Sequence, residues 1–273
     1  MPKNSLKGGT RMNEMQKFMA TLDSNLGYKT AILPLLPKGK VNILDFGGGT
    51  GVLSNAIKLS NPEAHVAILD INEEMLATAK QNNTADFYCN SIESLPHQAY
   101  DAIVLCSVLH ELKYWRYTLK NLQAKLRSGG ILVIRDGMRS RRYSYPRENG
   151  YSVKLRNPEK AKQFFEKCKA GSLISKLSIY FEEDYLVGDT DDVRSFLQTY
   201  TWGEDALERE QHENHLFASV NEIKSFLCDD LEYNPDDFKA TEICQQNYFK
   251  HLDKLIEVKE MWNTHMIITS KKY

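Results

Sequence analysis

The chain has 273 residues, of which 42% are hydrophobic, so it can bury a substantial core and is not a largely disordered protein. Its formal net charge of -1 and its pI near 6.7 exclude a general electrostatic attraction to nucleic acid or to an anionic membrane. The five cysteines are scattered and never form a Cys-x-x-Cys pair, so we expect reduced thiols in a cytoplasmic protein.

The N-terminal segment has basic residues with no apolar stretch behind them. No run of about 18 apolar residues occurs in the sequence, so we expect neither export nor a membrane anchor. Between residues 12 and 36, apolar side chains recur at helical spacing with a break at Gly27, which predicts two amphipathic helical pieces.

Residues 40–51, Lys-Val-Asn-Ile-Leu-Asp-Phe-Gly-Gly-Gly-Thr-Gly, contain the most informative motif. The apolar half suits a buried parallel strand, and the glycines allow a tight turn in which the backbone approaches a ligand. Residues 52–59 should form the next helix, with its first amide groups pointing back at the turn. The glycine spacing is not the G-x-G-x-x-G of dinucleotide-binding folds, and no Gly-Lys-Ser/Thr phosphate loop follows.

The order Asp45-x-Gly47-x-Gly49-x-Gly51 resembles the cofactor motif of class I S-adenosylmethionine-dependent methyltransferases. The resemblance covers residues 41–136 and implies that these four residues bind S-adenosylmethionine.

A second strand is predicted for residues 65–70, and it ends in Asp70. A carboxylate at this tip can accept both hydroxyl groups of a ribose, and we place Ile71 beside it in the cofactor site. The alternative is that Asp70 or Asn72 caps the helix predicted for residues 75–82.

A short third strand is predicted for residues 85–90. In the resembled family, the end of this strand offers a polar side chain and a backbone amide to the adenine edge, with an apolar residue against the ring. Asn90, Ser91 and Ile92 match this pattern, although many members have aspartate where Asn90 stands. The alternative is an ordinary loop asparagine.

Residues 100–106 are apolar through their centre and predict a fourth strand, buried on both faces and ending at the candidate cofactor residue Cys106. His110 follows in a Leu-His pair that is frequent in the resembled family. His110 has two possible roles, either as a packed histidine that flanks the cofactor or as a catalytic base. A helix is predicted for residues 114–126.

The fifth strand, residues 130–136, ends at Asp136. Because both strand tips could border the ligand crevice, His110 and Asp136 are the candidate catalytic residues. Histidine has the better ordinary pKa for a base near neutrality.

Closing strands are predicted at residues 238–245 and 264–271, after a helix at 220–227 that begins at Ser219 or Asn221. We therefore expect three parts, namely a cofactor-binding core in residues 1–137, an insertion in 138–215 that forms a lid or substrate platform, and the completion of the sheet in 216–273.

The insertion begins with a basic, tyrosine-containing stretch. Arg139, Arg141 and Arg142 could bind an anionic acceptor such as RNA or a phosphorylated metabolite, and a solvated basic loop is the alternative. The later part of the insertion is acidic, and its residues Glu210, His212, Glu213 and His215 suit a solvated helical face. No metal site is expected, because Glu210, His212, Glu213 and His215 do not have the H-E-x-x-H spacing.

The expected fold is α/β, a doubly wound, seven-stranded, mostly parallel Rossmann-like sheet with a helical insertion after the fifth strand. The resemblance implies an S-adenosylmethionine-dependent methyltransferase with a small-molecule or nucleic-acid acceptor. The alternatives are a non-catalytic cofactor-binding regulatory module and a nicotinamide-dependent reductase. The sequence identifies neither the acceptor nor the oligomeric state.

Overall fold

The computed structural model describes residues 29–138, 151–204, 207–211, 218–243, 255–257 and 265–273. A seven-stranded sheet with the order β3-β2-β1-β4-β5-β10-β9 forms its larger unit. The strands are β1 (Asn42–Phe46), β2 (His65–Leu69), β3 (Phe87–Cys89), β4 (Tyr100–Cys106), β5 (Leu126–Gly137), β9 (Lys239–Ile243) and β10 (His265–Lys271). Strands β1 to β5 are parallel, and β10 is antiparallel to both neighbours. The predicted fold class is confirmed.

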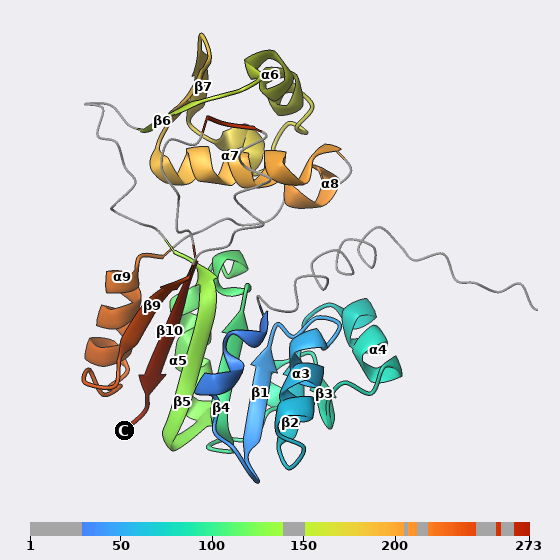
Figure 1. Ribbon diagram of the computed structural model, residues 1–273, viewed down its shortest axis with the longest axis vertical. Helices are drawn as coiled ribbons and strands as arrows, with labels where there is room; N and C mark the ends of the chain where they lie inside the picture. The colour runs from blue at the N-terminus through green and yellow to red at the C-terminus, as the bar shows by residue number, and fades with distance from the viewer. Residues whose placement is uncertain (1–28, 139–150, 205–206, 212–217, 244–254, 258–264) are drawn as a thin grey trace, which may run out of the picture.

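Helices cover both faces of this sheet (Figure 1). One face packs against α3 (Val52–Ser60) and α4 (Glu73–Gln81), and the other packs against α5 (Trp115–Lys125) and α9 (Val220–Ser225) with the π-helix η7 (Phe226–Asp230). Residues of β4 alternate between the two cores, with Ala102 and Val104 in one and Ile103 and Leu105 in the other. Burial on both faces explains why this strand is apolar from Ala102 to Cys106.

The structure moves the predicted start of β5 and decides between the two predicted starts of α9. Helix α5 passes directly into β5 at Leu126, whereas the sequence placed the start of the strand at residue 130; Leu126 pairs with Tyr100 before a bulge in the ladder. Helix α9 begins after Ser219, which forms a reciprocal capping box with Glu222.

The smaller unit contains a three-stranded antiparallel sheet, so the insertion is not purely helical. Its strands, in the order β6-β8-β7, are β6 (Tyr151–Lys154), β7 (Ile179–Glu182) and β8 (Tyr185–Gly188). Its helices are α6 (Pro158–Glu166), α7 (Thr190–Trp202) and α8 (Leu207–Glu210), with short 3-10 turns including η5 (Ile174–Lys176). The acidic run at Glu182 to Asp184 lies at the turn of the β7–β8 hairpin. Figure 1 shows this unit beyond the carboxyl ends of the parallel strands.

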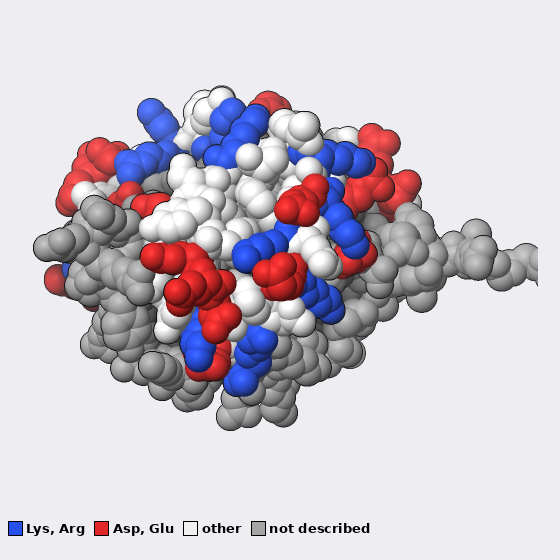
Figure 2. Space-filling view, turned by 90° about the horizontal axis from the view of Figure 1, so that it is seen from above, with Lys and Arg blue, Asp and Glu red and all other residues white. Residues whose placement is uncertain are grey.

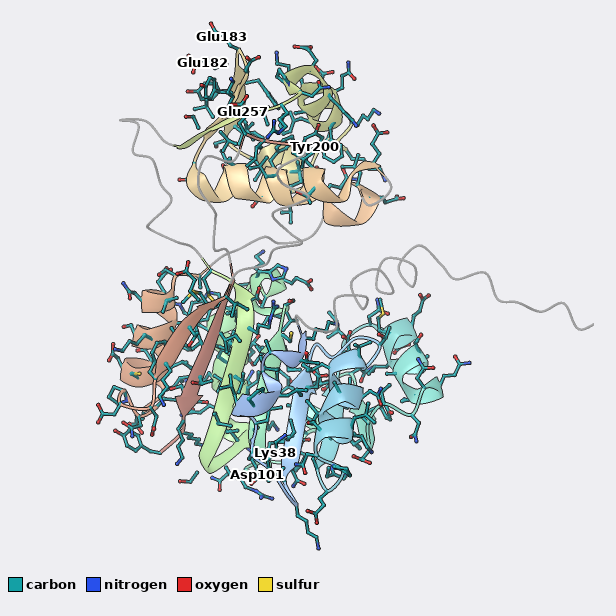
Figure 3. The ribbon with its side chains drawn as sticks, in the orientation of Figure 1. Lys38, Asp101, Glu182, Glu183, Tyr200 and Glu257 are labelled. Carbon is teal, nitrogen blue, oxygen red and sulfur yellow. The ribbon has the colours of Figure 1, made fainter. Side chains whose placement is uncertain are left out.

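A segment from the C-terminal part of the chain completes the smaller unit. Arg156 N donates to Leu255 O at 2.8 Å, and Glu257 N donates to Lys154 O at 2.9 Å. Ile256 is buried in the same apolar core as β6 and α7, and Figure 3 shows Glu257 within this unit. The sequence had assigned all residues after 216 to the core sheet.

Within the described residues, no helix is long and apolar enough to cross a membrane.

Candidate functional site

The turn after β1 brings three glycines into the left-handed backbone region. Gly47, Gly49 and Gly51 have φ of 70°, 54° and 81°. Gly47 N and Gly48 N both donate to Leu69 O, at 2.7 and 3.3 Å, which ties the turn to the end of β2. Helix α3 starts directly after Gly51 with no side-chain cap, so its first amides remain directed at the turn.

Packing explains two of these glycines as well as ligand access does. A Cβ on Gly47 would lie 2.5 Å from Cγ2 of Val108, and a Cβ on Gly51 would lie 1.9 Å from Oγ1 of Thr84. Both distances are far below van der Waals contact, so neighbouring side chains require glycine at these positions whether or not a ligand is bound.

Asp70 braces the glycine turn. Its Oδ2 accepts from Gly49 N and its Oδ1 accepts from Asn72 N, both at 2.8 Å. The helix cap is Asn72, whose side chain accepts from the amides of Glu74 and Met75, so the alternative that Asp70 caps α4 is wrong. Each carboxylate oxygen has two lone pairs, so Asp70 can also accept hydroxyl groups of a ligand.

Ile71 is 85% exposed at the same strand tip. An isoleucine this exposed beside a charged side chain offers an apolar surface to a flat ring. Asn90, Ser91 and Ile92 follow β3 at the same edge, since Asp70 N donates to Cys89 O at 3.1 Å. Asn90 is exposed and donates to Glu73 Oε1 at 3.5 Å, whereas Ile92 is half-buried against the core.

Asp45 lies beneath the turn and is only 1% exposed. Burial raises its pKa to about 6, although Oγ of Ser54 donates to its Oδ2 at 2.7 Å and opposes the shift. A cation near this carboxylate would favour its ionised form. Cys106 lies at the end of β4. Burial raises the pKa of its thiol, and the nearby positive charges of Arg135 and Lys29 partly counteract this rise.

His110 and Asp136, two separate candidates in the sequence, form one unit. His110 belongs to the short 3-10 helix η3 (Leu109–Glu111), and its Nδ1 lies 2.6 Å from Asp136 Oδ1. Asp136 is fully buried, and its Oδ2 accepts from the amides of Leu109, at 2.6 Å, and His110, at 3.2 Å. The second ring nitrogen of His110, Nε2, lies 3.9 Å from Glu111 Oε1. The carboxylate therefore fixes both the backbone and the ring of His110.

Two residues that the sequence analysis overlooked lie beside this pair. Arg135 is fully buried, and its Nη1 donates to Oγ of Ser107 at 3.3 Å. Ser107 has φ of 59°, which is unusual for a residue other than glycine. An arginine directly after the apolar run Ile131 to Ile134 was the available sequence signal.

The predicted substrate residues Arg139, Arg141 and Arg142 lie outside the described residues, as do His212, Glu213 and His215. Among the residues that the structure describes, no group of three or more His, Cys, Asp or Glu side chains is arranged to hold a metal ion.

Comparison with known families identifies the larger unit. The methyltransferase domain family matches residues 44–132, which include the glycine turn, Asp70 and His110. Residues 44–132 form a class I methyltransferase domain. Its family uses S-adenosylmethionine as the methyl donor.

Curated relatives match the same part of the chain. A malonyl-[acyl-carrier protein] O-methyltransferase of Bacillus anthracis is 32% identical over 98 residues, which cover 34% of this chain and 36% of the relative. The ribosomal RNA large subunit methyltransferase G of Pseudomonas syringae is 33% identical over 120 residues, covering 38% and 32%. This methyltransferase domain thus matches about a third of the length of each relative.

Solved structures resemble nearly the whole chain in fold. An S-adenosylmethionine-dependent methyltransferase of Thermotoga maritima has a TM-score of 0.54 at 15% identity, covering 95% of this chain and 96% of its own. One from Mesorhizobium loti has a TM-score of 0.52 at 15% identity, covering 89% and 96%.

The residues at the sheet edge fit S-adenosylmethionine. The Asp70 carboxylate and the exposed Ile71 offer partners for a ribose and an adenine ring, and the buried carboxylate of Asp45 complements a cationic ligand.

Proposed function

We propose that this methyltransferase domain transfers a methyl group from S-adenosylmethionine to an acceptor bound at the carboxyl edge of the sheet. The observation that supports this best is the left-handed glycine turn, which is hydrogen-bonded to Asp70. The turn and the Asp70 carboxylate are thereby held side by side, where both can contact S-adenosylmethionine. In this proposal Asp70 accepts the ribose hydroxyls, Ile71 and residues 90–92 border the adenine, and Asp45, Cys106 and the turn border the methionine part.

The cofactor supplies an electrophilic methyl group. The chain must hold the acceptor in line with it and exclude water. Where the acceptor has to lose a proton, we assign the base to His110 Nε2. Asp136 accepts from Nδ1–H and so leaves Nε2 able to take the proton.

The acceptor is proposed to be a small molecule, with RNA as the second candidate. The curated relatives are named for different acceptors, one a protein-bound malonyl group and one a ribosomal RNA, so they do not select a class. Figure 2 shows Lys and Arg side chains intermixed with Asp and Glu on the described part of one face, and nucleic-acid binding generally depends on many phosphate contacts made by clustered cations. Arg139, Arg141 and Arg142 remain candidate contacts to an anionic acceptor.

Calorimetric titration with S-adenosylmethionine, S-adenosylhomocysteine and NADH tests the cofactor. Both sulfur ligands should bind and NADH should not. Asp70→Ala should weaken binding by about 1.5 to 3 kcal/mol, because a charged acceptor is lost. Gly49→Val should abolish binding with the circular dichroism spectrum unchanged, since valine disfavours φ of 54°. The matched control is Asp101→Ala. Asp101 lies at the amino end of β4, away from the carboxyl ends of the strands (Figure 3), so this variant should not change affinity.

Binding of NADH alone would replace the methyltransferase proposal with the reductase. Binding of the sulfur ligands without labelled methyl incorporation into any RNA, protein or metabolite fraction would favour the regulatory module.

A further inference from the structure

A buried arginine and a serine in a left-handed backbone conformation meet at the tips of β5 and β4. Arg135 is paired in register with Cys106, so its backbone lies directly beside the end of β4. Arg135 Nη1 donates to Ser107 Oγ at 3.3 Å, and Ser107 N donates to Arg135 O at 2.8 Å. Both the side chain and the backbone of Ser107 are therefore held by one residue. With φ of 59°, Ser107 adopts a conformation that is unfavourable for a residue with a Cβ.

The conformation of Ser107 determines where the next three residues lie. Val108 contacts the cofactor turn so closely that Gly47 has no room for a Cβ. The amides of the next two residues, Leu109 N and His110 N, donate hydrogen bonds to Asp136 Oδ2. The same short segment thus touches the cofactor turn on one side and carries the candidate base on the other.

Arg135 is a charged residue among apolar side chains on one face of the sheet. Burying a guanidinium group is unfavourable, and apolar side chains of similar size often serve a buried position as well or better. The neighbouring side chains on this face of the sheet, Val133 and Ile267, are apolar and buried.

From this geometry we infer that Arg135 is a positioning residue: it holds Ser107 in the left-handed conformation and thereby keeps Val108 against the cofactor turn and His110 beside the acceptor. The inference rests on the proposed function, because it assigns the turn a role in cofactor and acceptor placement. It predicts that losing the contact harms cofactor binding while the fold persists.

The test uses the full chain and four variants, Arg135→Met, Ser107→Ala, their combination, and Lys125→Met as the matched control. Lys125 is a second buried cation at the end of α5, and its Nζ donates to Leu95 O at 2.6 Å. Three quantities are measured: affinity for S-adenosylmethionine by calorimetry, the free energy of unfolding in urea, and the imidazole ¹⁵N resonances of His110.

We expect each single variant at the contact to weaken cofactor affinity by about tenfold, as for the loss of one hydrogen bond from a charged donor. The combined variant should be no weaker than either single one, because both remove the same contact. The His110 resonances should move in these variants while a cooperative unfolding transition in urea persists. Lys125→Met should leave affinity and the His110 resonances unchanged, whatever its effect on the free energy of unfolding.

Wild-type affinity and unchanged His110 resonances in Ser107→Ala would overturn the inference, and this variant decides the matter even if Arg135→Met does not fold. Fully additive losses in the combined variant would also overturn it. If the wild type binds no S-adenosylmethionine, the proposed function fails, and the His110 resonances still test the positioning role separately.

Discussion

Replacing Asp45 with asparagine should make the protein more stable at neutral pH. Asparagine has nearly the shape of aspartate, and its amide oxygen can still accept from Ser54 Oγ. What it removes is a negative charge that burial disfavours, which is the main cause of the raised pKa of Asp45. The expected gain therefore depends on pH.

The size of the effect follows from the pKa. In the unfolded chain the carboxyl group loses its proton near its ordinary value of 3.8, whereas in the folded protein it keeps the proton up to about 6. Between these values the folded state binds more protons, so the contribution of Asp45 to stability falls as pH rises. A rise from 3.8 to about 6 corresponds to a loss of about 3 kcal/mol, complete above pH 6.

The assay is urea denaturation of the wild type and of Asp45→Asn between pH 4 and 7.5 without cofactor, followed by tryptophan fluorescence. All other groups titrate alike in both proteins, so the difference between the two curves isolates Asp45. The two should be similar near pH 4, and the variant should be more stable by up to about 3 kcal/mol at pH 7. Ser54→Ala removes the hydrogen bond that lowers this pKa, so it should move the transition to higher pH.

A stability difference that stays constant from pH 4 to 7.5 would refute the reasoning. A greater relative stability of the wild type at pH 7 would also refute it. In the same variant, affinity for S-adenosylmethionine should fall, because Asp45 is assigned to the cofactor site; a residue kept for binding at the expense of stability is common in functional sites.

Three further predictions concern the turn, the hairpin and the candidate base. Gly51→Ala should destabilise the fold by about 1 to 3 kcal/mol in urea denaturation, because its Cβ would meet Thr84 Oγ1 at 1.9 Å, and Thr84→Ala should recover part of the loss. Glu183→Gly should stabilise the β7–β8 hairpin by about 0.5 to 1 kcal/mol, because Glu183 has φ of 49°; faster amide exchange in that hairpin would contradict this. His110→Ala should lower methyl incorporation by about a hundredfold or more with cofactor affinity within a few fold, and Asp136→Asn should lower it too. If affinity and stability fall together with the rate, His110 is a packing residue.

Strands buried on both faces were predictable because burial alone requires apolar residues at consecutive positions. The limits of β4 agree with the sequence, since each residue from Ala102 to Leu105 enters one of two apolar cores. The glycine turn was predictable for a similar reason, because positive φ and close approach leave little choice of residue. Local sequence was sufficient wherever local backbone geometry or a continuous apolar run decided the structure.

Contacts between distant residues were not predictable in this way. The pairing of His110 with Asp136 depends on the distance between two neighbouring strand tips, and no periodicity reveals a contact of 2.6 Å. The role of Gly51 depends on Thr84, which belongs to a separate loop. The β7–β8 hairpin was missed because its turn is acidic and lacks the Asn-Gly or Asp-Gly that usually marks a two-residue connection.

The two-part construction of the smaller unit also affects how the chain folds during synthesis. Arg156 Nε donates to Ile256 O across 100 positions of sequence, and Ile256 lies in the core that β6 and α7 begin to build. At about 5 to 20 residues per second, a ribosome needs roughly 5 to 20 s to add those 100 residues. The larger sheet also remains incomplete during this time, since β10, which separates β5 from β9, is made after the other six strands of that sheet. A nascent chain therefore presents two incomplete apolar surfaces until Ile256 and strand β10 have emerged, so chaperone dependence should be greatest before β10 leaves the ribosome.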